Sequence, residues 1–135
     1  LRCDCQWQLN HALEMIAKKG SGVLVYLRQE GRGIGLASKL EAYNLQDQGL
    51  NTVEANLKLG FEADLREYEV AANILHELGI SKVQLITNNP TKAESLNVAG
   101  IQVVKTIPSI AEQNKENQKY LQTKVTHLGH KYPLD

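Results

Sequence analysis

The chain has 135 residues, of which 42% are apolar and 22% are charged. This length and apolar content suit one compact domain with a buried core and exclude disorder throughout the chain. The 15 lysines and arginines balance the 15 aspartates and glutamates. A surface without net charge excludes binding of nucleic acid or of an anionic membrane through bulk charge, so any recognition of phosphate must be local.

The sequence contains no segment that is long and apolar enough to span a membrane. Its longest uninterrupted apolar run covers residues 23–27, whereas a bilayer needs roughly 20 apolar residues. The first residues, LRCDC, do not form a signal peptide, and two cysteines are too few for a secreted disulfide framework. We therefore expect a cytoplasmic protein with no membrane and no nucleic-acid partner. Because the chain does not begin with methionine, we also expect residues 1–135 to be one N-terminally truncated domain.

Hydrophobic periodicity predicts a helix, a strand and a second helix in the first third of the chain. Apolar residues recur with the helical period from Leu9 to Ile16, and Gly20 ends that pattern. Residues 23–27 are apolar and partly β-branched, as is typical of a strand covered on both faces of a parallel sheet. A glycine-rich turn over residues 28–35 then leads into the second helix.

The rest of the chain continues this alternation. The patterns predict helices over residues 51–59, 70–78 and 92–98, strands over 83–86 and 101–104, and a C-terminal helix and tail over about 112–135. Residues 64–66 are polar enough for either a loop or a helix start. Strands that alternate with helices favour parallel pairing through right-handed crossovers. We therefore expect an α/β fold with three layers, α/β/α, around a mostly parallel sheet.

Cys3 and Cys5 are the first candidates for chemistry. They flank Asp4, and in an extended chain their side chains point the same way, so that both thiolates can reach one zinc ion. Two ligands are too few for a zinc site, which would need at least one more protein ligand. The alternative is two cysteines that merely lie close together near one end of the chain. A disulfide between them is disfavoured because the ring would be strained.

Two loops carry candidate phosphate ligands. Residues 28–35 contain glycines that allow close approach of the backbone, and Arg28 and Arg32 offer bidentate donors. This loop matches neither the dinucleotide-binding pattern nor the P-loop pattern. Residues 87–92, TNNPTK, place a hydroxyl, two amides and a lysine at an expected helix start, where an anion is favoured. The alternative for either loop is a solvated turn.

Asp64 and Arg66 lie two positions apart and can form an ion pair. Such a pair can belong to a functional site, where the carboxylate orients the guanidinium. It can equally be an ordinary surface pair, which is the commoner case. The sequence leaves both alternatives open.

Several blocks of the sequence together resemble the GTP cyclohydrolase II family. They are RCDC at 2–5, RQEGRGIG at 28–35, AYNLQDQG at 42–49, NTVEAN at 51–56, LGF at 59–61 and LITNNP at 85–90. The resemblance runs from residue 1 to about residue 131 in the order and spacing of the family. It implies hydrolysis of GTP to 2,5-diamino-6-ribosylamino-4(3H)-pyrimidinone 5′-phosphate, formate and pyrophosphate, the first committed step of riboflavin biosynthesis.

The resemblance also implies cofactors and roles for individual residues. The family uses zinc at the ring-opening site and magnesium at the phosphates, and Cys3 and Cys5 match two of its three zinc cysteines. The third lies in a segment upstream of residue 1. Contacts to GTP are implied for Gln8, Glu30, Gly31, Arg32, Thr52, Thr87 and Lys92. Catalytic roles are implied for Tyr43 at the ring nitrogen, for Asp64 as a general base and for Arg66 at the α-phosphate.

Two roles for Arg66 stay open at this point. In the family proposal Arg66 is a nucleophile that forms a phospho-guanidinium link. In the alternative Arg66 stays cationic, since its pKa lies above about 12, and clamps the charge that develops on the phosphoryl group.

The identity of the whole protein also has alternatives. The family is commonly homodimeric, so we expect a homodimer. A catalytically silent paralogue that binds purine nucleotides would share many of these residues, but it would not need Tyr43, Asp64 and Arg66. The chain can also be half of a bifunctional enzyme that makes 3,4-dihydroxy-2-butanone 4-phosphate as well. A zinc knuckle that binds nucleic acid is disfavoured by the neutral charge and by the few aromatic residues, one Trp, five Tyr and one Phe.

Overall fold

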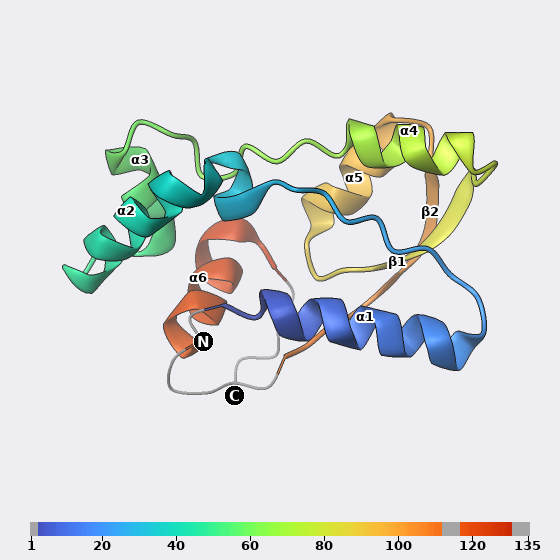
Figure 1. The fold of residues 1–135 in the computed structure, drawn as a ribbon, viewed down its shortest axis with the longest axis horizontal. Helices are drawn as coiled ribbons and strands as arrows, with labels where there is room; N and C mark the ends of the chain where they lie inside the picture. The colour runs from blue at the N-terminus through green and yellow to red at the C-terminus, as the bar shows by residue number, and fades with distance from the viewer. Residues whose placement is uncertain (1–2, 112–116, 131–135) are drawn as a thin grey trace. The chain divides into compact units, whose positions relative to one another are not determined.

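The computed structural model describes residues 3–111 and 117–130 (Figure 1). In chain order the elements are α1 (Cys5–Lys19), η1 (Glu30–Gly33), α2 (Gly35–Asp47), α3 (Thr52–Lys58), α4 (Glu69–Glu77), β1 (Lys82–Ile86), α5 (Pro90–Val98), β2 (Gln102–Ile107) and α6 (Gln118–Leu128). They form two compact units. Unit 1 combines Leu1–Tyr26 with Tyr68–Asp135, and unit 2 is Leu27–Glu67.

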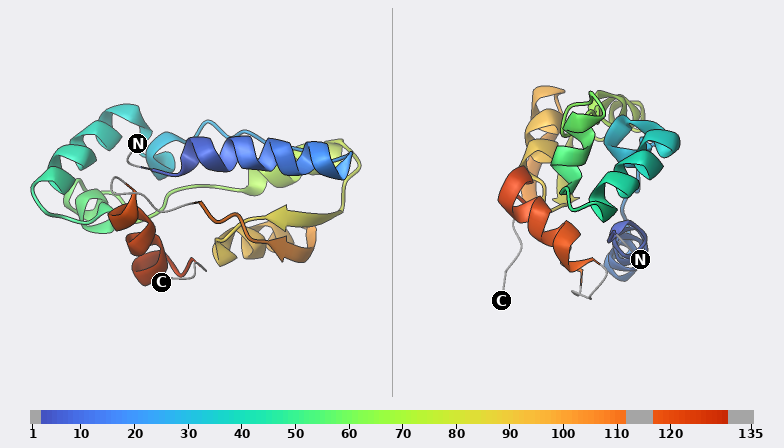
Figure 2. Two further views of the ribbon diagram at one scale, coloured as in Figure 1. Left: turned by 90° about the horizontal axis from the view of Figure 1, so that it is seen from below. Right: turned by 90° about the vertical axis from the view of Figure 1, so that its left-hand side faces the viewer.

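The sheet of unit 1 consists of β1 and β2 in the described part of the chain. The strands are parallel, and their register runs from Lys82 opposite Gln102 to Ile86 opposite Ile107, with one irregularity after Val83. Helix α5 connects them and contacts β2, while α4 contacts α5 (Figure 2). This strand, helix and strand unit confirms an α/β fold with parallel pairing.

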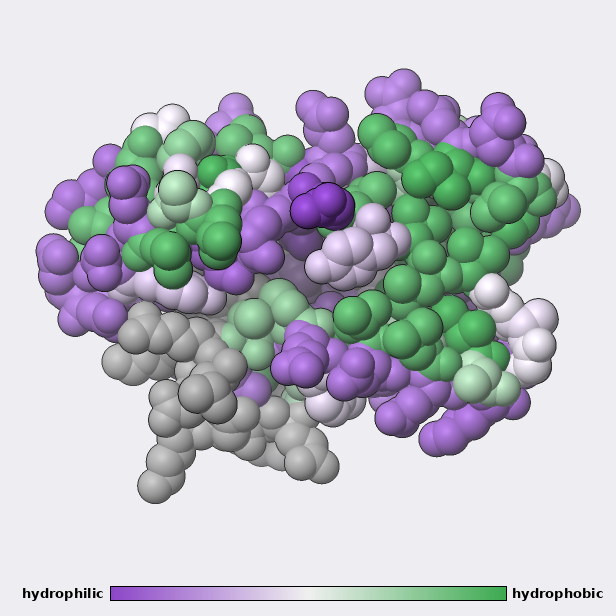
Figure 3. Space-filling view, viewed as in Figure 1, coloured by the Kyte–Doolittle hydropathy of each residue, from purple (hydrophilic) through white to green (hydrophobic). Residues whose placement is uncertain are grey.

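Helix α4 is apolar on two faces. Ala71, Ala72 and Leu75 are buried in the core of unit 1. Val70, Ile74 and Leu78, which follow one another at intervals of four residues, are exposed. Figure 3 shows apolar side chains gathered over the α4 region of this face. A helix that is apolar all round usually packs on both sides.

Unit 2 is built from η1, α2 and α3, and both η1 and α3 contact α2. The start of α3 is fixed by a capping box. The Asn51 side chain accepts hydrogen bonds from the backbone N–H groups of Val53 and Glu54, at 2.9 and 3.0 Å. The Glu54 carboxylate accepts one from the backbone N–H of Asn51 at 2.8 Å. These bonds satisfy donors that have no partner inside the helix.

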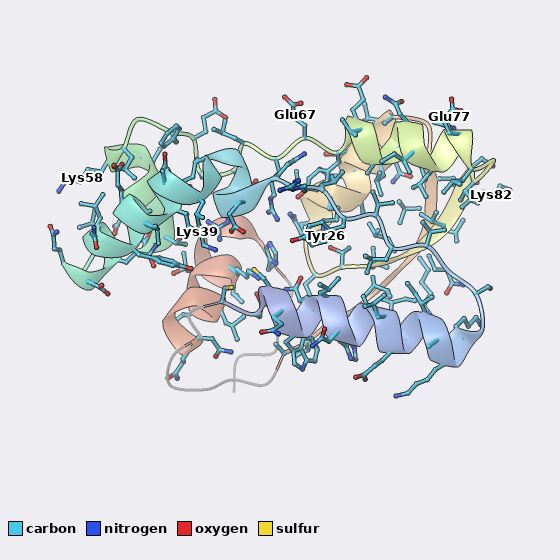
Figure 4. The ribbon with its side chains drawn as sticks, viewed as in Figure 1. Tyr26, Lys39, Lys58, Glu67, Glu77 and Lys82 are labelled. Carbon is cyan, nitrogen blue, oxygen red and sulfur yellow. The ribbon has the colours of Figure 1, made fainter. Side chains whose placement is uncertain are left out.

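Most expected elements are confirmed, but the strand over residues 23–27 is wrong. Residues 21–29 form neither helix nor strand. Val23 is 44% exposed and Tyr26, labelled in Figure 4, is 69% exposed. An apolar run becomes a strand only when another strand supplies hydrogen-bond partners, and none of the described residues does so here. The described sheet therefore has two strands rather than the three that we expected.

The remaining expectations can be placed briefly. Residues 64–66 lie in a loop, and the C-terminal helix is present as α6. Of the expected C-terminal region, residues 112–116 and 131–135 lie outside the described residues. Within the described ranges, no helix combines the length and apolar character needed to cross a membrane.

Candidate functional site

The glycine-rich loop of unit 2 approaches the segment that carries Asp64 and Arg66. Gly31 and Arg32 have φ angles of 64° and 60°, and Gly33 has 95°. A Cβ atom on Gly33 would lie 3.1 Å from backbone atoms of Leu65. The backbone N–H of Leu65 donates a hydrogen bond of 3.0 Å to the carbonyl of Arg32. Glycine at position 33 thus permits a close approach of two backbones, and the left-handed conformation of Arg32 is unusual for a residue with a side chain.

Asp64 and Arg66 form a bidentate ion pair. Arg66 Nε donates to Asp64 Oδ1 at 2.8 Å, and Arg66 Nη2 donates to Oδ2. The backbone N–H of Arg66 also donates to Oδ1, at 3.2 Å. Partial burial alone would raise the pKa of the Asp64 carboxyl, but the hydrogen bonds and the charge of Arg66 outweigh it and lower that pKa. Asp64 is therefore ionised at neutral pH.

Arg32 and Thr52 join this pair. Arg32 Nη1 lies 3.5 Å from the hydroxyl oxygen of Thr52, the first residue of α3. The charge of Arg32 also helps to lower the pKa of Asp64. We call Arg32, Thr52, Asp64 and Arg66 the arginine cluster. It holds two guanidinium groups and one carboxylate, so it has an excess of positive charge suited to an anion.

A second group in unit 2 connects Glu30 to Tyr43 through Lys39. Lys39 Nζ lies 2.7 Å from Glu30 Oε1 and 5.6 Å from the centre of the Tyr43 ring. The hydrogen bond from Lys39, followed by one from the backbone of Gly31, lowers the pKa of Glu30. Lys39 is labelled in Figure 4. Sequence reasoning missed it, although its position four residues before Tyr43 on a helix was an available signal.

In unit 1 the two cysteine side chains lie within hydrogen-bonding reach of each other. That hydrogen bond is the largest cause of a raised pKa at the Cys5 thiol, and the charge of Lys124 acts in the opposite direction. Two neighbouring thiols fit two positions of a zinc site. Across residues 3–111 and 117–130, however, no three or more His, Cys, Asp or Glu side chains are grouped so that they could hold a metal ion. A complete site therefore needs a ligand from elsewhere.

Asp4, between the two cysteines, is almost completely buried. Its carboxylate accepts a hydrogen bond of 2.5 Å from Gln8 Nε2 and lies 2.6 Å from Lys124 Nζ. Gln8, a predicted nucleotide contact, therefore touches Asp4 in this structure. Sequence reasoning missed both Asp4 and Lys124. No sequence signal could have paired them, because Lys124 lies 120 positions away on a different helix.

Thr87 and Lys92 lie around the start of α5, just after β1. The buried hydroxyl oxygen of Thr87 accepts a hydrogen bond of 3.1 Å from the backbone of Asn89. The Asn89 side chain in turn caps α5. Lys92 Nζ lies 5.6 Å from the centre of the Tyr68 ring, within the range of a cation–π contact.

Asn88 connects this loop to the segment that follows β2 through two hydrogen bonds. Its Nδ2 donates a hydrogen bond of 2.5 Å to the carbonyl of Ser109, and its Oδ1 accepts one of 2.9 Å from the Ser109 backbone. Asn88 was part of the turn pattern, but its partner was not predictable from local sequence. The two bonds hold the loop that carries Thr87.

The predicted site residues thus fall into groups within each unit. Unit 2 holds the arginine cluster, Glu30 with Gly31, and Tyr43. Unit 1 holds Cys3, Cys5 and Gln8 around Asp4, and separately Thr87 with Lys92.

Comparison with known proteins then gives the family. A family model described as GTP cyclohydrolase II matches residues 1–108. The chain belongs to the GTP cyclohydrolase II family. The matched region contains every predicted site residue of this family member and ends before α6.

Curated relatives agree with that assignment. GTP cyclohydrolase-2 of Hahella chejuensis is 55% identical over 130 residues, which cover 96% of this chain and 63% of the relative. GTP cyclohydrolase-2 of Shewanella baltica (strain OS155) is 54% identical, with 96% and 64% covered. Riboflavin biosynthesis protein RibBA of Chlorobium phaeovibrioides is 57% identical, with 96% and 32% covered. This GTP cyclohydrolase II family chain therefore spans just under two thirds of the first two relatives and about one third of the last.

Proposed function

We propose that the protein is a GTP cyclohydrolase II of riboflavin biosynthesis. It hydrolyses GTP to 2,5-diamino-6-ribosylamino-4(3H)-pyrimidinone 5′-phosphate, formate and pyrophosphate. The observation that carries the proposal is the arginine cluster, in which Arg66 is ion-paired with Asp64 and the positive charge of Arg32 also acts on that carboxylate. Membership of the family and the names of the relatives support the choice of GTP as the anion.

The arginine cluster favours a clamp at the phosphates over a nucleophilic arginine. A nucleophilic Arg66 would have to lose a proton, and its ion pair with Asp64 stabilises the protonated form. Asp64 has a lowered pKa, which makes it a weak base and suits it to orienting Arg66 or a water molecule. In this proposal Arg66 stabilises charge that develops at the α-phosphate.

The other nucleotide contacts are assigned by their chemistry. Main-chain N–H groups near Gly31, the hydroxyl groups of Thr52 and Thr87 and the ammonium group of Lys92 suit phosphate or ribose oxygens. Gln8 and Glu30 carry groups that can bond to the edge of the base. Magnesium would accompany the phosphates, since Mg²⁺ is commonly held by substrate phosphates and one or two carboxylates.

Ring opening would depend on Cys3, Cys5 and Tyr43. The two thiols would hold zinc together with a third donor from outside the described residues. A zinc ion held there would lower the pKa of a water molecule towards neutrality and so supply a stronger nucleophile than free water. The Tyr43 hydroxyl donates a proton or a hydrogen bond to the ring nitrogen on which charge develops.

The proposal includes a setting and an assembly. A cytoplasmic homodimer agrees with the family, and the exposed apolar stripe formed by Val70 and Ile74 on α4 and by Leu78 at its C-cap favours association with a second copy. The three-layer α/β/α arrangement is also part of this proposal. The described residues contribute two strands to the sheet, with α4 and α5 as their neighbours in the chain.

A second candidate is the cyclohydrolase half of a bifunctional enzyme that also makes 3,4-dihydroxy-2-butanone 4-phosphate. The 57% identity to the Chlorobium riboflavin biosynthesis protein, of which the chain covers 32%, favours it. A silent purine-nucleotide-binding paralogue is the third candidate, and Tyr43, Asp64 and Arg66 speak against it.

The affinity for GTP of an Arg66→Met variant tests the proposal. Loss of charge-assisted hydrogen bonds to phosphate should weaken binding about tenfold or more in isothermal titration calorimetry. The matched control is Lys58→Met, an exposed cation at the end of α3 in the same unit, which should bind GTP within about twofold of the unchanged protein. Equal affinities of all three proteins would contradict the role of the arginine cluster.

A further inference from the structure

The N-terminal end of α1 lies beside α6 (Figure 1). A buried ion pair joins Asp4, which precedes α1, to Lys124 on α6. Asp4 is 2% exposed and Lys124 is 6% exposed, and their charged atoms lie 2.6 Å apart. Both residues belong to unit 1. Lys124 lies on α6, outside the region matched by the family model.

Burying this pair is not the simplest way to attach α6. Removing two charges from water is costly, and well-packed apolar residues often stabilise a protein as well or better. Apolar contact is available on the same helix, because Leu121 is 1% exposed. What an ion pair supplies and an apolar contact does not is a fixed direction for the carboxylate. The geometry at Asp4 agrees with this, since Lys124 holds Oδ1 while Gln8 holds Oδ2.

Fixing Asp4 also fixes its two neighbours. Asp4 is the N-cap residue of α1, and its carbonyl accepts a hydrogen bond of 2.9 Å from the backbone of Gln8. With both its backbone and its side chain held, the directions of the Cys3 and Cys5 side chains are restricted. Because Cys3 and Cys5 are the immediate neighbours of Asp4 in the chain, holding Asp4 limits how far the two thiols can move apart, and two ligands of one ion must stay close together.

We propose that Lys124 is a positioning residue, which through its ion pair with Asp4 holds Cys3 and Cys5 in the arrangement that binds one thiophilic divalent cation. This inference rests on the metal role of the two cysteines in the proposed function. Lys124 is not itself a ligand. It acts in the way that outer residues orient the ligands of other metal sites.

The test uses cobalt(II), whose charge-transfer absorption with thiolates reports the coordination, and all proteins in it carry an upstream extension with one further cysteine, which supplies the third donor of the proposed site. Lys124→Met should weaken cobalt binding about tenfold or more and reduce the intensity of the thiolate band. Lys124→Arg, which keeps the charge, should restore binding to within about threefold. Gln122→Met, an exposed position on the same helix, should leave affinity and spectrum unchanged. A purely structural contact would predict no change of the band in a folded Lys124→Met protein, and that result would overturn the inference.

A variant with both charges removed separates the loss of metal binding from misfolding of the Lys124→Met protein. Asp4→Asn combined with Lys124→Met leaves no uncompensated buried charge, so it should keep the helical circular dichroism of the unchanged protein. It should nevertheless bind cobalt as weakly as Lys124→Met alone, and affinity equal to that of the unchanged protein would overturn the inference. If the unchanged protein shows no thiolate band, or if Cys5→Ser does not reduce it, the metal role of the cysteines fails and the inference fails with it. A band that depends on Cys5 but not on Lys124 rejects the inference alone.

Discussion

Arg66 donates hydrogen bonds to the Asp64 carboxylate from its side chain and from its own backbone N–H group. The spacing of the two residues in the sequence predicted that they can form an ion pair, but it could not distinguish a functional pair from a surface pair. Two features of the structure favour function. The positive charge of Arg32, on η1, also lowers the pKa of Asp64, and the backbone of Arg32 is left-handed while its carbonyl accepts a hydrogen bond from Leu65. Strained backbone of this kind is concentrated at functional sites.

The lowered pKa of Asp64 makes a prediction about stability. Because its folded-state pKa lies below the ordinary aspartate value of about 3.9, the ionised form stabilises the folded state. That stabilisation is fully present above about pH 4 and is lost as the pH falls through the lowered value. Asp64→Asn should therefore reduce the free energy of unfolding by about 1 kcal/mol at pH 7 in urea denaturation.

The same measurement at low pH gives the control. Well below the folded-state pKa, the unchanged protein and Asp64→Asn should have nearly equal free energies of unfolding. Glu62→Gln, at an exposed position two residues away, should change little at either pH. A loss in Asp64→Asn that is equally large at both pH values would show that the charge of Asp64 is not the cause.

Tyr43 provides a test that separates the two parts of the proposed reaction. Its hydroxyl is assigned to the ring nitrogen, whereas the arginine cluster is assigned to the phosphates. Tyr43→Phe should therefore stop release of formate from GTP but leave release of pyrophosphate measurable. Quantifying both products in one reaction checks this, and an equal loss of the two would count against the role of Tyr43.

At the scale of elements, α3 carries Thr52 into the arginine cluster as its first residue. The capping box of Asn51 and Glu54 fixes this helix start. Asn51→Ala should lower the free energy of unfolding by about 1 kcal/mol, because two backbone donors lose their acceptor. It should also weaken GTP binding, because Thr52 is no longer held in place.

The control for this prediction is Asn44→Ala on α2. Asn44 is exposed within the helix, and alanine there has the higher helix propensity, so stability should stay the same or rise slightly. Thermal unfolding and GTP titration of both variants give the comparison. Destabilisation of Asn44→Ala equal to that of Asn51→Ala would mean that the cap has no special role.

The elements also show what local sequence could predict. The helices α1 and α4 were predictable because their apolar period and their end signals lie within or directly beside the segments themselves, and α5 because cap formers precede it and Gly100 follows it. The strand over residues 23–27 was wrong because strand formation depends on a partner elsewhere in the chain. The pairing of Asp4 with Lys124 was missed for the same reason, and lysine is usually expected on the surface.

At the scale of the whole molecule, the chain forms two units, of which unit 2 lies in sequence between the two parts of unit 1. The resemblance to the family predicted the site residues, but the sequence could not show that they are divided between the two units. The arginine cluster, Glu30 and Tyr43 belong to unit 2, while the cysteines, Gln8, Thr87 and Lys92 belong to unit 1. The structure describes how each group is held within its own unit.

We propose that this family member opens the guanine ring of GTP with the help of a thiolate-bound metal. Formate release from GTP by zinc-loaded protein tests it most directly, measured on this chain and on a version extended upstream to include one further cysteine. We expect the extended protein to release formate and pyrophosphate, and we expect Cys3→Ser or Cys5→Ser to abolish the release of formate. Formate release that persists without both cysteines, or an extended zinc protein that leaves GTP intact, would contradict it.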